Sequence, residues 1–154
     1  MPAKIKPGEE FLGIGLVGPL TKSPEGDFET KAGAPLVAEA WKAILSTQRS
    51  VGQRRNFIAG ERFMRDDFGT NIKSLKHMNM DDDMVAFMEA EFVEALEKHE
   101  ARAVVSNIRT EMDEVNQVTR TFINGTVIGS NDKVNLVIIR DSKGKLSFSS
   151  LEGA

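Results

Sequence analysis

The chain of 154 residues contains no cysteine and no long apolar run. Without cysteine there is no disulfide and no thiolate-bound metal, and nothing points to an oxidising compartment. The start of the chain lacks the apolar core of a signal peptide, and no apolar stretch of about 18 residues follows, so we expect neither export nor a membrane span. A net charge of −3 predicts no general affinity for nucleic acid. The composition, 40% apolar and 28% charged, predicts a folded soluble protein made in a cytoplasm.

Proline is absent after residue 35: all five prolines and six of the thirteen glycines fall within residues 1–35. Fixed φ angles and missing N–H donors make regular structure hard to sustain there. We therefore expect an extended arm at residues 1–34, with at most one short strand around residues 11–17. Residues 35–154 are expected to form a single domain.

Three helices are predicted after the arm. Pro35 suits a first helical position, and a stripe at helical spacing follows it at Val37, Trp41, Ile44, Leu45 and Gln48. A short helix is expected at residues 70–78. The third helix begins with a run of negative charge, which favours a helix N-terminus, at Asp81, Asp82 and Asp83. One apolar face of this helix is formed by Met84, Met88, Phe92 and Leu96.

From residue 103 the apolar period changes to two. Three β-branched segments at 104–112, 118–129 and 133–141 are separated by short links, and a last short strand is expected at 146–148. Strands joined by such short links pair antiparallel. The sequence therefore predicts an α+β fold with an N-terminal extended arm, about three helices and a C-terminal antiparallel meander of three to four strands.

Charge is distributed unevenly along the helical part. Residues 49–77 carry seven basic and three acidic residues, whereas residues 78–114 carry eleven acidic and three basic residues. Such polarity suits docking against charged partners, and two solvated faces would give the same pattern.

Motifs for cofactors and metals are weak. The glycines of GIGLVG (13–18) match a dinucleotide fingerprint, but Pro19 follows and no helix opens there, so we interpret them as turn or close-approach positions. His77 and His99 have no metal-ligand spacing and are expected on helix surfaces. We expect no cofactor and no metal.

One catalytic alternative uses a carboxylate pair. Glu61 and Glu100 are candidates for the acid and base of a peptidoglycan-cleaving, muramidase-like enzyme, a reaction that needs two carboxyl groups. Arg62 follows Glu61, and Arg102 lies two residues from Glu100. A neighbouring guanidinium favours the ionised carboxylate, which is the wrong form for a general acid. No catalytic residue is therefore predicted, and the enzyme remains the alternative.

The order of the motifs along the chain is similar to that of a known protein family. FLGIGLVGPL (11–20), a helix ending in AILST (43–47), GERFMRDDFG (60–69), an acidic helix and HEAR (99–102) follow one another and lead into the meander. This order resembles the tail-lysozyme-like baseplate wedge family of contractile-tailed phages, with relatives in contractile bacteriocins and type VI secretion baseplates. The family pattern of Leu-x-Thr, Gly-Glu-Arg, Phe-Gly and Glu-Pro-Arg falls here on Leu45 and Thr47, Gly60, Glu61 and Arg62, Phe68 and Gly69, and Glu100 and Arg102.

Two departures from the family pattern stand out. The family places Gly-Glu-Arg two or three residues after the threonine, whereas here twelve residues, 48–59, intervene. The nearer GQR at 52–54 is a rival for the alignment, but only the copy at 60–62 has Phe-Gly at the expected distance. In the Glu-Pro-Arg motif Ala101 replaces proline. We expect this change to loosen the turn and to lower its stability by some tenths of a kcal/mol to about 1 kcal/mol.

The resemblance implies a non-enzymatic wedge component of a phage tail baseplate that serves as sheath initiator. It implies a place in the virion after assembly in the host bacterial cytoplasm, and six copies around the tail axis. The implied partners are the larger wedge proteins, the tail sheath protein, and tail hub or tube proteins, without nucleic acid or membrane. A phage is favoured over a bacteriocin or a secretion system.

Two sets of residues are predicted to carry this role. A structural clasp that binds the wedge proteins is formed by Gly60, Glu61, Arg62, Phe68, Gly69, Glu100 and Arg102; we call residues 60–69 the clasp loop. Within this loop the apolar side chains of Phe63, Met64 and Phe68 are expected to anchor it to the core. The segment chosen as sheath-docking strand, or as the sheet centre beside that strand, carries Val134, Leu136, Ile138 and Arg140. Whether the charged partners of the clasp lie within the chain or across an interface stays open.

Overall fold

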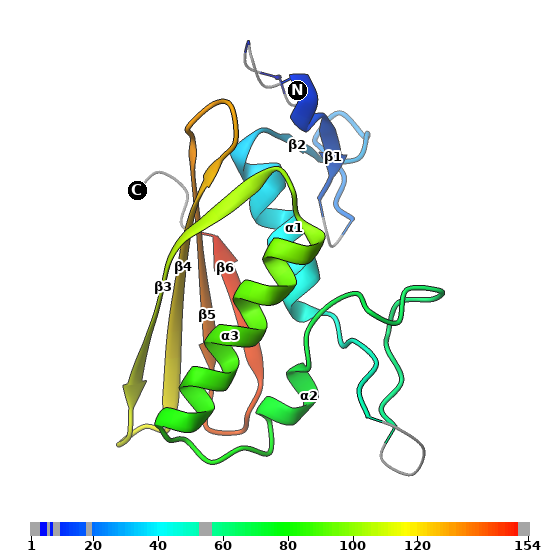
Figure 1. Cartoon of the computed structure of the whole chain (residues 1–154). Helices are drawn as coiled ribbons and strands as arrows, with labels where there is room; N and C mark the ends of the chain where they lie inside the picture. Colours follow the sequence, from blue (N-terminus) through cyan, green and yellow to red (C-terminus); the bar gives the residue numbers. More distant parts are fainter. Residues whose placement is uncertain (1–3, 6, 8–9, 18–19, 53–56, 151–154) are drawn as a thin grey trace.

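The computed structural model describes residues 4–5, 7, 10–17, 20–52 and 57–150. Two long helices, α1 and α3, lie side by side on one face of a four-stranded sheet, so the domain has two layers (Figure 1). This is an α+β fold, as the sequence predicts. In the described part of the chain, no helix is both long and apolar enough to cross a membrane.

The N-terminal segment has more structure than the sequence predicts. A short 3₁₀ turn, η1 (Glu10–Leu12), precedes strand β1 (Ile14–Leu16), and β1 pairs antiparallel with β2 (Thr30–Ala32). The expectation of at most one strand was wrong because three residues are too few for a visible period. A side chain at Gly15 would lie 2.4 Å from Leu36 Cδ1, so the expected close approach is confirmed there. The division into an arm and a domain stays a prediction.

The helices follow the predicted stripes. Helix α1 (Ala34–Ser46) buries Val37, Trp41, Ile44 and Leu45, and Gln48 beyond its end is also fully buried. Helix α2 (Ile72–Leu75) is shorter than the predicted 70–78. Helix α3 (Asp82–His99) buries Met84, Met88, Phe92 and Leu96. The Asp81 side chain caps α3 by accepting a hydrogen bond from the Met84 N–H at 2.8 Å, which confirms the role predicted for this acidic run.

The sheet is a meander of four antiparallel strands in sequence order. These are β3 (Ala103–Asp113), β4 (Val118–Val127), β5 (Lys133–Arg140) and β6 (Leu146–Ser150). Strand β5 therefore lies inside the sheet, paired with β4 on one side and β6 on the other, whereas β3 and β6 form the two edges.

One apolar core lies between the helices and the sheet. Its largest side chain, Trp41, is fully buried, and its ring lies over Gly125 of β4. A Cβ atom at Gly125 would lie 2.3 Å from the indole ring, so only glycine allows α1 to pack this closely. This packing fixes the end of α1, from which the chain leaves for the clasp loop.

Candidate partner-binding site

The base of the clasp loop is closed by a reciprocal pair of hydrogen bonds. The Glu61 N–H donates to the Gln48 carbonyl oxygen at 2.9 Å, and the Gln48 N–H donates to Glu61 Oε2 at 3.0 Å. Glu61 thus has its partner within the chain. Although the two residues lie thirteen positions apart in the chain, the loop returns to the residue that follows Thr47.

The local geometry is tight at both glycines of the clasp loop, and it requires glycine at residue 69. The Gly60 N–H donates to Ser50 Oγ at 2.9 Å, and a Cβ atom at Gly60 would lie only 3.1 Å from that oxygen. Gly69 has a φ angle of +106°, and a Cβ atom there would lie 2.2 Å from the Thr47 carbonyl oxygen. Glycine is therefore needed at residue 69 both for its φ angle and for the close approach.

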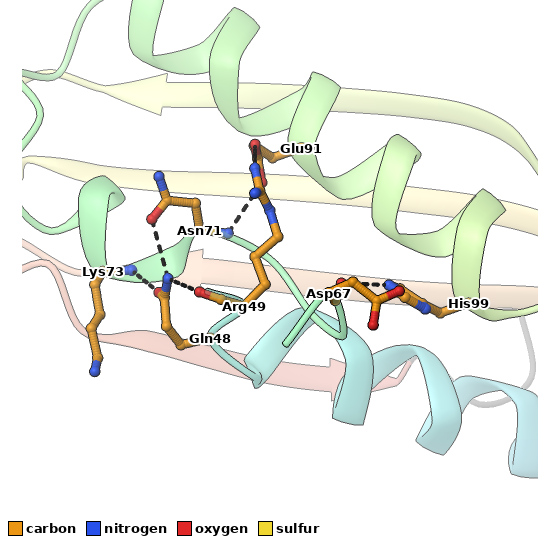
Figure 2. A network of polar contacts seen from close by, with 7 residues as sticks. All are labelled: Gln48, Arg49, Asp67, Asn71, Lys73, Glu91 and His99. Carbon is orange, nitrogen blue, oxygen red and sulfur yellow. Dashed lines mark hydrogen bonds and ion pairs between the residues drawn. The ribbon is translucent and has the colours of Figure 1, made fainter. Parts of the chain in front are cut away.

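The far side of the clasp loop stacks on the end of α3. The Arg62 guanidinium lies 4.1 Å from the centroid of the half-buried Phe68 ring, a cation–π geometry. The Phe68 ring packs in turn on the His99 ring at a centroid distance of 4.9 Å. His99 Nε2 is 3.0 Å from the Asp67 carbonyl oxygen (Figure 2), so this residue at the end of α3 also contacts the clasp loop, a contact that the sequence did not predict.

A buried amide holds the segments on either side of the clasp loop together. The fully buried Gln48 side chain donates to the Arg49 carbonyl at 2.6 Å and to Asn71 Oδ1 at 3.3 Å (Figure 2). Its own Oε1 accepts from the Lys73 N–H at 2.9 Å. Both polar atoms of this amide are therefore hydrogen-bonded, and the network fixes the path of the chain.

An ion pair joins this network to the middle of α3. Arg49 Nη2 lies 2.7 Å from Glu91 Oε1, and the Asn71 N–H donates to Glu91 Oε2 at 3.1 Å (Figure 2). One carboxylate thus binds the chain before and after the clasp loop. Sequence reasoning missed Glu91, because an acid on an acidic helix carries no signal of a partner 42 residues away.

The second half of the predicted clasp is a buried ion pair. Arg102 Nε and Nη2 donate to Glu100 Oε1 and Oε2 at 2.8 and 2.7 Å, and the Arg102 backbone N–H adds a third bond at 3.0 Å. The Glu100 side chain is 5% exposed and that of Arg102 is 30% exposed. The hydrogen bonds from Arg102 to the carboxylate raise the pKa of Arg102 above its ordinary value.

Arg102 also reaches the N-terminal segment. Its Nη1 donates to the Leu12 carbonyl oxygen at 3.2 Å, and its own carbonyl accepts from the Ile128 N–H at 2.9 Å. One arginine thereby connects the end of α3, the start of β3, the turn after β4 and η1. Arginine suits this role because its fork offers several donors in one plane.

The two halves of the clasp are neighbours without a direct polar link. Across the described residues, no hydrogen bond or ion pair joins Glu61 or Arg62 to Glu100 or Arg102. The connection runs through His99, which precedes Glu100 in the chain and packs on Phe68. Glu100 is buried with both oxygens bound to Arg102, so it is poorly placed to donate a proton to a large substrate.

The turn at residues 62–65 of the clasp loop differs from the prediction. Phe68 packs against the core, but Phe63 and Met64 are 85% and 84% exposed, so the expectation that they anchor the loop was wrong. They occupy the centre of a turn closed by the Arg65 N–H donating to the Arg62 carbonyl at 3.2 Å, and this turn directs them away from the core.

The strand chosen for sheath docking lies in the sheet centre, the second of the two places that the sequence allowed. Val134, Leu136 and Ile138 are buried against the helices, and both edges of β5 are paired. Arg140 is buried as well and donates to the carbonyl oxygens of Leu75 at 3.1 Å and Met78 at 3.3 Å. These bonds hold the chain between α2 and α3. Because β5 is paired on both sides, it offers no free edge to another strand in the folded monomer.

The fold is shared with chains from contractile-tail baseplates. A chain of the six-fold symmetrised anti-feeding prophage (AFP) baseplate is 22% identical with a TM-score of 0.65, covering 80% of this chain and 92% of that chain. A chain of the postcontracted pyocin R2 baseplate is 19% identical with a TM-score of 0.52, covering 75% and 99%. A candidate tail lysozyme from Geobacter sulfurreducens is 23% identical with a TM-score of 0.50, covering 77% and 90%. A search of curated proteins found no match.

The fold shared with baseplate chains and the family match define a structural protein of the baseplate-wedge type from contractile injection systems. The sequence model of one family, baseplate wedge protein gp25, matches residues 32–132. The chain belongs to this family, which confirms the predicted resemblance. The matched region contains both halves of the clasp and ends before β5.

Proposed function

We propose that this protein is a non-enzymatic wedge subunit of a contractile phage tail baseplate, and that the clasp binds the larger wedge proteins. The observation that carries the proposal is the family match over residues 32–132, which contains every clasp residue. The clasp is an arrangement for holding segments together, because Glu61 is bound to the Gln48 backbone N–H and Glu100 to Arg102 within the chain.

In this proposal Arg102 acts as the joint between the core and a partner. Its side chain is partly exposed although two of its nitrogens hold Glu100. A neighbouring chain that covers Arg102 would bury the Arg102–Glu100 pair further. It would also gain binding free energy from the charge of Arg102. The N-terminal segment, tied to Arg102 through Leu12, would be positioned by the same contact.

For sheath initiation we propose an edge strand rather than β5. Strand addition needs unpaired backbone groups, and in the described sheet these lie on the outer sides of β3 and β6. Strand β6 is short, serine-rich and next to β5, so β5 supports the docking edge from inside the sheet. A sheath strand added to β6 would extend the sheet to five strands.

The position in the particle is part of the same proposal. A similar chain comes from a six-fold symmetrised baseplate, which supports six copies of this protein around the tail axis, close to the tail hub or tube. Assembly in the cytoplasm of the host bacterium would precede incorporation into the virion. No nucleic acid or membrane partner is needed.

The test is deletion of the gene in the phage or particle that encodes it, followed by complementation. Wild-type protein should restore tails with extended sheaths in electron micrographs, and Arg102→Ala should not. Arg109→Ala is the matched control, because this arginine lies on β3, the strand that follows Arg102, with an exposed side chain paired to Glu111. Melting curves must show that each variant is folded at the growth temperature. Normal tails without the protein would contradict the proposal.

The muramidase alternative has its own test. Similarity to a candidate tail lysozyme is the observation in its favour. Purified protein should release no soluble fragments from peptidoglycan, with hen-egg-type lysozyme as positive control. Activity that disappears in Glu61→Gln would establish the enzyme and overturn the non-enzymatic assignment.

A further inference from the structure

The tip of the clasp loop presents two large apolar side chains to solvent. Phe63 and Met64 are 85% and 84% exposed, adjacent in sequence, and at the centre of one turn. Single exposed apolar residues are common on protein surfaces, but an adjacent pair at the apex of a loop forms a projecting apolar group. We call Phe63 and Met64 the loop tip.

The loop below the tip is braced on both sides. The Ser50 N–H donates to the Asp66 carbonyl at 2.7 Å, next to the bond from Gly60 to Ser50 Oγ. On the other side Arg62 lies over Phe68, which packs on α3. A braced loop loses little conformational entropy when its tip is bound, which favours a role in recognition.

The backbone at Met64 adopts a conformation that is uncommon for residues other than glycine. Met64 has a φ angle of +57°, in the left-handed region. It occupies the third position of the turn from Arg62 to Arg65, where a positive φ favours glycine or asparagine. A long apolar side chain in this conformation that does not pack on its own core adds no burial to the monomer, which favours a role outside the chain.

We propose that the loop tip inserts into an apolar pocket on a larger wedge protein; this inference rests on the proposed function and names the contact that the clasp loop makes. An aromatic ring beside a flexible thioether fits a pocket of aliphatic and aromatic side chains. The family match over residues 32–132 contains Phe63 and Met64, so the occupant to which we commit is a protein of the same baseplate. The surrounding residues 49–77 carry seven basic and three acidic residues, so an anionic membrane is tested as a separate outcome.

Two variants and one control test the tip. Phe63→Ser removes the ring, and Met64→Gly removes the side chain while relaxing the positive φ angle. Val115→Ser is the control, because Val115 is 91% exposed in the link between β3 and β4, away from the clasp loop. If the tip only stabilised the fold, both tip variants would lower the melting temperature.

Binding is measured with purified larger wedge proteins from the same tail gene cluster, alongside particle assembly. Each tip variant should bind about tenfold more weakly or worse, with an unchanged or higher melting temperature for Met64→Gly, while Val115→Ser binds like the wild type. Wild-type binding by both tip variants would overturn the proposed binding role of the loop tip and leave the proposed wedge function intact. Failure of the wild type to bind any wedge protein and to enter particles would overturn the wedge function and the tip with it.

Two further outcomes identify a different occupant and would overturn the proposal. Concentration-dependent dimerisation of the wild type that is lost in Phe63→Ser would place the pocket on a second copy. Pelleting with phosphatidylserine vesicles that is lost in the same variant would make the occupant a membrane.

Discussion

Replacing Arg102 with alanine should destabilise the monomer by about 3 kcal/mol. The change leaves the Glu100 carboxylate, 5% exposed, without the two guanidinium hydrogen bonds at 2.8 and 2.7 Å. Removing one partner of a buried ion pair costs about 3–5 kcal/mol. The lower end applies because the backbone N–H of residue 102 still donates to Glu100 and because the Arg102 side chain is 30% exposed. For a chain of this size the loss corresponds to a fall of about 6–12 °C in melting temperature.

Urea unfolding followed by tryptophan fluorescence measures this loss. The chain has a single tryptophan, Trp41, which is fully buried in the core and reports global unfolding. Arg109→Ala removes an exposed ion pair and a guanidinium 5.3 Å from the centroid of the Phe122 ring, so it should cost no more than about 1 kcal/mol. In a double-mutant cycle, Glu100→Ala combined with Arg102→Ala should cost less than the sum of the single changes, with a coupling energy of about 2 kcal/mol. A loss below 1 kcal/mol for Arg102→Ala, or an additive cycle, would refute the reasoning.

Two further predictions concern a glycine and a carboxylate. Gly69→Ala should cost about 3 kcal/mol or more in thermal unfolding, because its Cβ atom would lie 2.2 Å from the Thr47 carbonyl. Gly26→Ala shares the positive φ angle but has no atom within 4 Å of its Cβ, so it should cost only about 1 kcal/mol; equal losses would refute the clash. The Asn116 side-chain amide, followed by its backbone N–H, lowers the pKa of Asp113, so Asn116→Ala should raise that pKa in an NMR titration. Because the folded pKa is depressed, the stability from this contact is present at neutral pH and is lost as the pH falls through the acidic range; an unchanged titration of Asp113 would contradict this.

The regular elements could be predicted from the sequence because periodicity reports burial directly. The stripe from Val37 to Leu45 and the alternation through β4 and β5 each match one buried face. Strand β2 was missed because it has three residues and its pairing with β1 depends on a link of thirteen residues. Short strands of this kind are specified by their partners rather than by their own pattern.

The candidate site could be predicted only where its partners are close in sequence. Glu100 and Arg102 are two residues apart, so their pairing follows from local geometry. The contacts of Glu91 and His99 depend on the path of the intervening loop, which composition does not encode. The apolar character of Phe63 predicts that its side chain is buried. This prediction was wrong, because a turn can direct a large side chain outward as readily as inward.

Twelve residues lie between Thr47 and Gly60, where the family pattern has only two or three, and yet Glu61 lies beside Gln48. Val51 forms an antiparallel bridge with Ile58, and Gln48 forms a parallel bridge with Thr70. The inserted segment therefore leaves and returns at nearly the same point, and Glu61 comes to lie on Gln48, directly after the threonine that the family pattern places before Gly-Glu-Arg. The hydrogen bonds of Gly60 and Glu61 at this point support the alignment of the motif with residues 60–62, whereas most of the rival copy at 52–54 lies outside the described residues. The insertion can then vary in length, because its closure changes the entropy of the loop only slowly with each added residue.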